Sequence, residues 1–220
     1  MILSLPDILT PEELTEVRQL CHDGDFIDGK FSAGGAAKAV KNNLQMSPAS
    51  ERFKTIETLI FQAARRSPRF QAMAFPVKLH SLRVSRYTPG MHYGTHVDSA
   101  VMGAGRFRTD VSVTVFLSDP SEYQGGDLQI GSPYERSFKL AAGSLLAYPS
   151  TTLHRVMPVF SGERLVAVFW VKSQVRNAAQ REILADLDVV KRTLFERQGT
   201  TVEFDLLNSS YTNLLRMWAE

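Results

Sequence analysis

The sequence predicts a mainly β domain with flanking helices, folded as a sandwich or jelly roll. Between Lys78 and Lys172, short runs of β-branched and aromatic residues are separated by glycine and proline, which is typical of about eight strands joined by turns. Apolar residues recur at helical spacing before and after this segment. Hydrophobic residues make up 44% of the 220 positions and charged residues 22%, as is usual for a globular protein.

The N-terminal segment, residues 1–77, is expected to be helical and to pack on the barrel. The run Thr10–Glu13 has the composition of a capping box with proline at the first helical position, and an apolar stripe follows it. A second helix is expected over 47–66. Residues 23–45 are glycine-rich and are expected to be mostly loop. Within them, Gly34–Ala37 has the small residues of an anion-binding loop, but it matches no phosphate-binding pattern, and a plain loop is the favoured interpretation.

The β domain, residues 78–176, is predicted to contain a strand that is buried on both faces. Leu165–Val171 is apolar at every position, so it should be central, with the barrel interior on one side and helices on the other. Val111–Leu117 is a second strong strand, and Gly125-Gly126 predicts a tight turn.

Residues 177–220 are predicted to form a C-terminal helical hairpin. Gly199 separates two sets of apolar residues at helical spacing, which are Ile183, Leu187, Val190 and Leu194, then Phe204, Leu207, Tyr211, Leu214 and Trp218. The hairpin is expected to pack on the sheet. A contact between identical chains, giving a homo-oligomer through these helices, is the alternative.

The strongest functional signal is the pair His96 and Asp98. Residues two apart on a strand point to the same face, whereas on a helix they diverge by about 200°. The preceding run Leu82–Tyr87 alternates as a strand does, and Pro89-Gly90 interrupts it as a turn. An imidazole and a carboxylate on one face are two of the three ligands of a 2-His-1-carboxylate site, which binds Fe(II) and leaves positions open.

A third metal ligand and an anchor for an anion occur later in the sequence. His154 lies in the next-to-last strand region, and a jelly roll places an early strand beside a late one, so His154 is expected to reach the pair. Arg164 begins the last strand and shares a face with Val166 and Val168. A guanidinium at the mouth of an apolar barrel needs an anion, which a small carboxylate held by two hydrogen bonds would supply. An exposed arginine paired with a loop carboxylate is the alternative.

These residues together resemble the iron and 2-oxoglutarate signature of the Fe(II)/2-oxoglutarate dioxygenases. Among these enzymes the chain is similar to the bacterial PKHD-type hydroxylases, which are related to prolyl 4-hydroxylases. The stretches that carry the resemblance are Arg86–Gly90, Tyr123–Leu128, Tyr148–Val156, Gly162–Arg164 and Trp170–Arg176. The resemblance implies the double-stranded β-helix form of the jelly roll. It also implies Fe(2+), O2, 2-oxoglutarate as cosubstrate and L-ascorbate as an accessory, in a reaction that hydroxylates a C–H bond and converts 2-oxoglutarate to succinate.

The resemblance assigns a role to each matching residue. His96, Asp98 and His154 would bind iron, and Arg164 would hold the distal carboxylate of 2-oxoglutarate. Tyr87 would donate a hydrogen bond to that cosubstrate, or else be an ordinary core aromatic.

Three features beside these residues have less definite roles. Thr114, in the predicted strand Val111–Leu117, is a further candidate for binding the cosubstrate. His92 and Tyr93 would line the substrate mouth or simply pack there. Residues 102–106 would form a mobile lid, although an ordinary loop is the favoured interpretation.

The composition also limits partners and location. A net charge of +2 with no basic block gives no sign of nucleic-acid binding, and no run of about 18 apolar residues suggests a membrane span or secretory signal. Cys21 is the single cysteine, which excludes an internal disulfide and fits the reducing cytoplasm. The substrate is expected to be peptidyl or a small molecule.

Two other functions fit part of the sequence. A cupin-type enzyme using another metal without 2-oxoglutarate is one, because histidine and carboxylate ligands do not select iron by affinity. A non-catalytic sensor barrel that binds a partner through its C-terminal helices is the other. The complete ligand set and Arg164 favour the dioxygenase.

Overall fold

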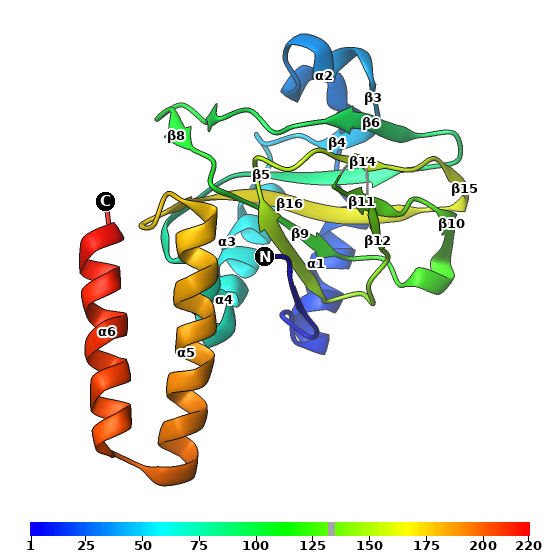
Figure 1. The fold of residues 1–220 in the computed structure, drawn as a ribbon. Coiled ribbons are helices and arrows are strands. Elements are labelled where there is room, and N and C mark those ends of the chain that lie inside the picture. Colours follow the sequence, from blue (N-terminus) through cyan, green and yellow to red (C-terminus); the bar gives the residue numbers. More distant parts are fainter. Residues whose placement is uncertain (132–134) are drawn as a thin grey trace.

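Two antiparallel sheets face each other at the centre of the structure, a computed structural model that describes residues 1–131 and 135–220 (Figure 1). In spatial order, the larger sheet contains β1 (Leu3–Leu5), β13 (Leu145–Pro149), β9 (Val111–Phe116), β16 (Arg164–Ser173), β5 (Pro76–Tyr87), β4 (Leu44–Met46) and β2 (Phe26–Asp28). The smaller sheet contains β12 (Arg136–Phe138), β11 (Leu128–Ile130), β14 (His154–Val156), β6 (His92–His96) and β3 (Lys41–Asn42). Two short pairs complete the strands, β10 (Tyr123–Gly125) with β15 (Val159–Gly162), and β7 (Val101–Met102) with β8 (Phe107–Arg108).

The predicted mainly β fold with flanking helices is confirmed, and β16 is its central strand. It pairs with β5 on one side and β9 on the other. Its odd-numbered residues, such as Leu165 and Phe169, join a core shared with the helices. Val166 and Val168 belong to a second core between the two sheets. The strand is therefore buried on both faces, as its continuous apolar sequence predicts.

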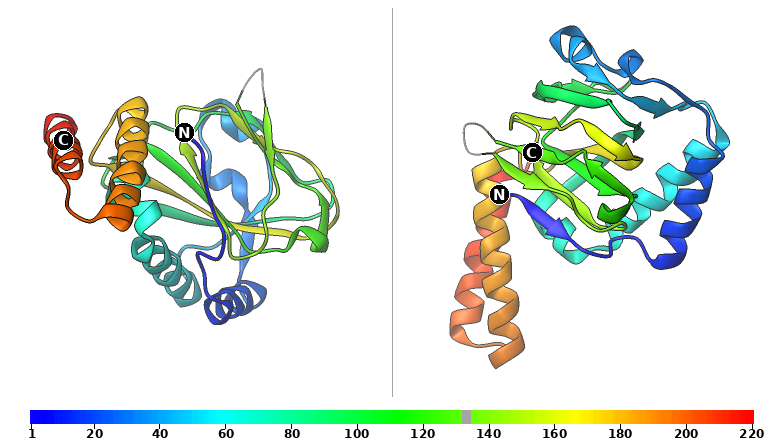
Figure 2. Two further views of the ribbon diagram at one scale, coloured as in Figure 1. Left: turned by 60° about the horizontal axis from the view of Figure 1, so that its bottom comes forward. Right: turned by 90° about the vertical axis from the view of Figure 1, so that its right-hand side faces the viewer.

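Helices cover the outer face of the larger sheet. They are α1 (Pro11–His22), α3 (Glu51–Arg66) and α4 (Pro68–Ala74), and their buried side chains form one core with that sheet (Figure 2). Thr10 and Glu13 form the predicted capping box of α1. The second helix begins later than predicted, at Glu51, because the side chain of Ser50 accepts a hydrogen bond from the backbone of Phe53 and caps the helix there.

The expectation of loop for residues 23–45 is wrong. This segment contains β2, β3 and the first residues of β4, together with the 3-10 helix η1 (Gly29–Ser32) and the short helix α2 (Gly35–Ala39). A second 3-10 helix, η2 (Pro120–Glu122), precedes β10. β3 pairs with β6 and β4 pairs with β5. Strands of two or three residues show no period in the sequence, so pairing with longer neighbours determines them.

The C-terminal hairpin consists of α5 (Ala178–Gln198) and α6 (Val202–Trp218), and its far end projects beyond the sheets (Figures 1 and 2). Gly199 ends α5 with a φ of 70°, a conformation that favours glycine. Val175 and Ala219 form a β-bridge where the hairpin leaves and rejoins the barrel. Nowhere in the described part of the chain is a helix both long and apolar enough to span a bilayer.

Arg181 fastens α5 to the barrel. Its buried guanidinium donates to the carbonyl oxygens of Val175 and Arg176, each at 2.8 Å, and of Asp110 at 3.1 Å. These acceptors belong to the barrel and to the segment leading into α5, so one side chain connects the two parts.

Replacing Arg181 with alanine is expected to lower the free energy of unfolding by about 2–4 kcal/mol, because buried carbonyl groups lose a charged donor. Urea unfolding followed by circular dichroism measures the change. Arg192→Ala, which removes an exposed partner of Asp188, is the control and should cost less than about 0.5 kcal/mol. Equal effects of the two substitutions would contradict this role for Arg181.

Candidate metal centre and its cavity

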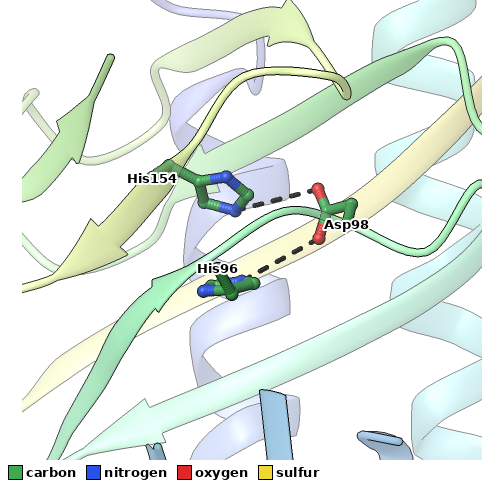
Figure 3. A group of neighbouring side chains, drawn as sticks. All are labelled: His96, Asp98 and His154. Carbon is green, nitrogen blue, oxygen red and sulfur yellow. Dashed lines mark ion pairs between the residues drawn. The ribbon is translucent and has the colours of Figure 1, made fainter. Parts of the chain in front are cut away.

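His96 and His154 face each other across two paired strands of the smaller sheet. In the register of β6 and β14, His154 lies directly opposite His96, and the ring centroids are 4.3 Å apart. Asp98 follows β6, and its carboxylate oxygens lie 3.9 Å from His96 Nε2 and 3.7 Å from His154 Nε2 (Figure 3). The three potential ligand atoms all fall within 4.8 Å of one another. The structure thus brings together the three side chains that the sequence singled out.

Backbone carbonyl groups orient both imidazoles. His96 Nδ1 lies 2.8 Å from the carbonyl oxygen of Gly94, and His154 Nδ1 lies 3.0 Å from that of Thr152. An Nδ1–H that donates to a carbonyl leaves the lone pair on Nε2, which in each ring faces Asp98. The two Nε2 atoms and one carboxylate oxygen are therefore available to a single cation.

Ser112 holds the carboxylate of Asp98. Its hydroxyl donates to Asp98 Oδ2 at 2.5 Å and lies 2.8 Å from the hydroxyl of Ser150. Such neighbouring hydrogen bonds fix the orientation of a metal ligand. Sequence reasoning missed this role of Ser112, because the meeting of β9 with the segment after β6 has no local signal.

Burial keeps His96 neutral in the metal-free protein. Burial, and to a smaller extent the proximity of His154, lower its pKa to about 4, and Asp98 opposes the shift. Tyr93 stacks on the ring of His96 with centroids 3.7 Å apart and adds to the burial. A neutral imidazole is the form that coordinates a metal.

A cavity of about 870 Å³, part of it open to solvent, joins these three side chains to Arg164. Tyr87, Tyr93, Met102 and Thr114 also line it. Among the residues described, His92 is not part of the lining, and its Nδ1 lies instead 3.3 Å from the carbonyl oxygen of Gly90. Gly34 and Ala37, expected in a loop, line the cavity from α2 and the residue before it.

Arg164 is buried, and it forms no ion pair with any residue that the structure describes. Its side chain is among the largest of those fully buried, and the residue is 1% exposed. Within the described part of the chain, its Nε and Nη1 atoms have no hydrogen-bond acceptor. The preceding acid, Glu163, pairs with Arg86 at 3.3 Å instead. The alternative of an exposed arginine paired with a loop carboxylate is therefore wrong.

Asn43 is a second buried polar residue that sequence reasoning missed. It is 3% exposed, it lines the cavity, and both atoms of its amide lack partners among the described residues. Leu44 pairs with Arg86, so Asn43 lies beside Tyr87, which pairs with Arg164. One row across three strands thus presents an amide, a phenol and a guanidinium. Only the register of β4, which has no sequence signal, reveals this row.

Two family models match the chain. The 2OG-Fe(II) oxygenase superfamily matches residues 82–172, and the PKHD-type hydroxylase C-terminal domain matches residues 179–220. A PKHD-type hydroxylase of Crocosphaera subtropica is 50% identical over 222 residues, which cover the whole of both chains. A second, from Picosynechococcus, is 48% identical over 221 residues, again over both whole chains.

The chain belongs to the PKHD-type hydroxylases. The PKHD-type hydroxylases lie within the 2OG-Fe(II) oxygenase superfamily, so this protein is an oxidoreductase of the dioxygenase class. The predicted family is confirmed.

Solved structures support the fold of this PKHD-type hydroxylase. A prolyl hydroxylase from Trichoplax adhaerens, in complex with a hypoxia inducible factor peptide fragment, has a TM-score of 0.59 and 16% identity, covering 81% of this chain and 86% of that chain. An oxidoreductase of the 2OG-Fe(II) oxygenase family from Burkholderia pseudomallei has a TM-score of 0.58 and 16% identity, covering 78% and 85%. At such low identity, these similarities concern the fold alone.

The burial of His96 predicts how the stability of the metal-free PKHD-type hydroxylase depends on pH. Unfolding raises the pKa of this imidazole from about 4 to its ordinary value of about 6.5, so the unfolded chain binds more protons between these values. The free energy of unfolding should therefore fall as the pH decreases from about 6.5 to about 4. The imidazole of His96 contributes at most about 1.4 kcal/mol per pH unit to this fall. Urea unfolding in the presence of a chelator measures it, and an equal slope in His96→Gln would contradict the prediction.

Proposed function

We propose that the protein is an Fe(II)- and 2-oxoglutarate-dependent hydroxylase, with His96, Asp98 and His154 as its metal ligands. Two neutral imidazoles and one carboxylate are the donor set of non-haem Fe(II) oxygenases. Oriented Nε2 atoms and the hydrogen-bonded carboxylate of Asp98 fit a divalent cation. Membership of the 2OG-Fe(II) oxygenase superfamily supports iron over other metals.

The unpaired guanidinium of Arg164 carries the proposed dependence on 2-oxoglutarate. A buried charge without a counterion costs several kcal/mol. Unlike the guanidinium of Arg181, that of Arg164 has Nε and Nη1 atoms with no acceptor, not even a carbonyl, among the described residues, which favours a bound anion there. The cavity that Arg164 lines also reaches the proposed metal ligands. A dicarboxylate is suited to this arrangement, because one end would face the cation of the metal and the other would face Arg164. A cupin-type enzyme that does not use 2-oxoglutarate would leave this charge uncompensated.

Tyr87 and Asn43 would hold the same end of the cosubstrate as Arg164. The guanidinium carbon of Arg164 lies 5.1 Å from the centroid of the Tyr87 ring. The Asn43 amide can donate to a carboxylate and has no other partner in the described structure. Thr114 also lines the cavity and would contact the middle of the cosubstrate. These four roles are part of the proposal.

The protein's contribution to the reaction is to position groups and exclude water. When bound, the iron, 2-oxoglutarate and O2 supply the oxidising chemistry that hydroxylates a C–H bond and releases succinate and CO2. The carbonyl groups of Gly94 and Thr152 fix the imidazoles, and Ser112 fixes Asp98. Apolar side chains between the sheets, such as Val166, keep water from the cavity.

The substrate class, the accessory, the location and the division of the chain are also proposals. The substrate would be a peptide or a small molecule, L-ascorbate would be an accessory, and the location would be cytoplasmic. We further propose that residues 78–176 form the catalytic barrel and that residues 1–77 pack on it. Residues 177–220 would provide a contact for a homo-oligomer. A sensor barrel without catalysis would not need the complete ligand set.

Removing the charge at Arg164 is expected to weaken 2-oxoglutarate binding. Arg164→Ala should raise the Kd by about 10²–10³-fold, or about 3–5 kcal/mol, because a buried partner of the carboxylate is lost. Calorimetric titration of 2-oxoglutarate into anaerobic, metal-loaded protein measures the affinity. Arg86→Ala removes a cation that already has the partner Glu163, and it should leave the affinity unchanged. An unchanged affinity in Arg164→Ala would refute the proposed role.

Replacing a proposed ligand is expected to abolish iron loading. His154→Ala should take up no stoichiometric Fe(II), and Ser112→Ala should bind it about 10–100-fold more weakly, because Asp98 is no longer held. Metal analysis after anaerobic reconstitution measures both. His92→Ala, on the same strand as His96, is the control and should load fully. Full occupancy of His154→Ala would remove this histidine from the ligand set.

A further inference from the structure

Two other cations, Lys41 and Arg83, line the same cavity as the proposed metal ligands. Lys41 is 5% exposed, and its ammonium donates to the hydroxyl of Ser32 at 2.8 Å. Arg83 donates to the carbonyl oxygens of Leu82, at 2.8 Å, and of Ser81, at 3.4 Å. All of these acceptors are uncharged, so the hydrogen bonds do not compensate either charge.

Within the described residues, neither cation has an acidic partner. Among the ion pairs of the described residues, none involves Lys41 or Arg83, although Asp28, Glu57 and Asp98 act on them from a greater distance. Burial, and to a smaller extent the like charge of Arg83, lower the pKa of Lys41 to about 8. Burial also lowers the pKa of Arg83. Two desolvated positive charges that repel each other indicate a site that binds an anion.

This pair lies at the metal side of the cavity and away from Arg164. Lys41 lies opposite Tyr93 in the β3–β6 register, and Tyr93 stacks on His96. Arg83 lies four residues before Tyr87, the partner of Arg164, which is about 13 Å along the strand. The carboxylate that Arg164 holds is therefore too far away to neutralise these two cations. The other end of the cosubstrate would face the metal, whose charge it compensates.

A hydrogen-bonded chain holds Lys41 in the cavity. The hydroxyl of Ser32 donates to Gln45 Oε1 at 2.5 Å, and the amide of Gln45 donates to Ser85 Oγ at 3.1 Å. These contacts connect the N-terminal segment to β5. Lys41 lies outside residues 82–172, the part that the superfamily model matches. The N-terminal segment therefore adds a charge to a cavity that the shared barrel forms.

We propose that Lys41 and Arg83 bind an anionic oxygen group of the prime substrate, a carboxylate or a phosphate, beside the metal centre. This inference rests on the proposed function of the same cavity. The guanidinium supplies a planar pair of donors and the ammonium a compact charge, a combination that suits either anion. A neutral substrate would leave the buried ammonium of Lys41 and the half-buried guanidinium of Arg83 without a counterion, so the pair selects acidic substrates over their amides.

The test uses acetate, inorganic phosphate and acetamide as probes of the full-length protein. The protein is loaded with Mn(II) and saturating 2-oxoglutarate without O2, and paramagnetic relaxation of each probe is measured by nuclear magnetic resonance. Acetate or phosphate should show saturable relaxation at least about fivefold stronger than acetamide, because only the anions meet the two cations. Phosphate is followed by its 31P signal and acetate by its methyl protons, so the two are compared by their half-saturating concentrations. A lower value for phosphate assigns a phosphate substrate, and a lower value for acetate assigns a carboxylate.

The Lys41→Gln/Arg83→Gln variant should reduce the relaxation of both anions to the level of acetamide. Arg52→Gln/Lys54→Gln, on the exposed side of α3, removes the same net charge and should change nothing. The two single variants guard against a folding defect in the double variant. Equal relaxation of acetate, phosphate and acetamide in the unaltered protein, or anion relaxation that persists in the variant, would overturn the inference.

A parallel calorimetric titration of 2-oxoglutarate separates this inference from the proposed function. If the unaltered protein binds 2-oxoglutarate but does not prefer the anions, the inference alone fails. If it binds no 2-oxoglutarate, the proposed function fails and the inference fails with it.

Discussion

The antiparallel register of β6 with β14 is the constraint on which the rest of the site depends. It places His96 and His154 directly opposite each other, and the following turn carries Asp98 back toward both rings. A shift of one residue in either strand would move a histidine to the opposite face of the sheet. β11 pairs with β14 and β3 pairs with β6, and these outer pairings hold the register of the two strands. The donor set is thus a product of strand pairing rather than of flexible loops.

Positive charge inside the barrel opposes the stability of the fold. Arg164, Lys41 and Arg83 line one cavity, in which Asp98 is a lone acid among the described lining residues. The compensating stability comes from elsewhere, chiefly from the apolar core between the larger sheet and its three covering helices. Because most of that core lies on the helix-covered face of the larger sheet, away from the cavity, the interior can retain unpaired polar groups for binding without losing the fold.

The elements with a strong local signal could be predicted from the sequence. The capping box of Thr10, the stop at Gly199 and the doubly buried β16 all agree with the structure. So does the convergence of His96, Asp98 and His154, because the strand period and the resemblance indicated the same face. The short strands between 23 and 45 were not predictable, since pairing alone determines them. Ser112, Asn43 and Lys41 were missed because their neighbours in space lie far away in the sequence.

The β-bridge between Val175 and Ala219 joins the two ends of the C-terminal helical hairpin. Both ends are anchored at the barrel, and Arg181 adds a third attachment near the start of α5. The turn after Gly199 lies at the far end of the hairpin from these attachments and contributes no residue to the described lining of the cavity (Figure 1). The turn is accordingly a suitable position for a fluorophore, a surface tether or an inserted peptide that must leave the interior undisturbed.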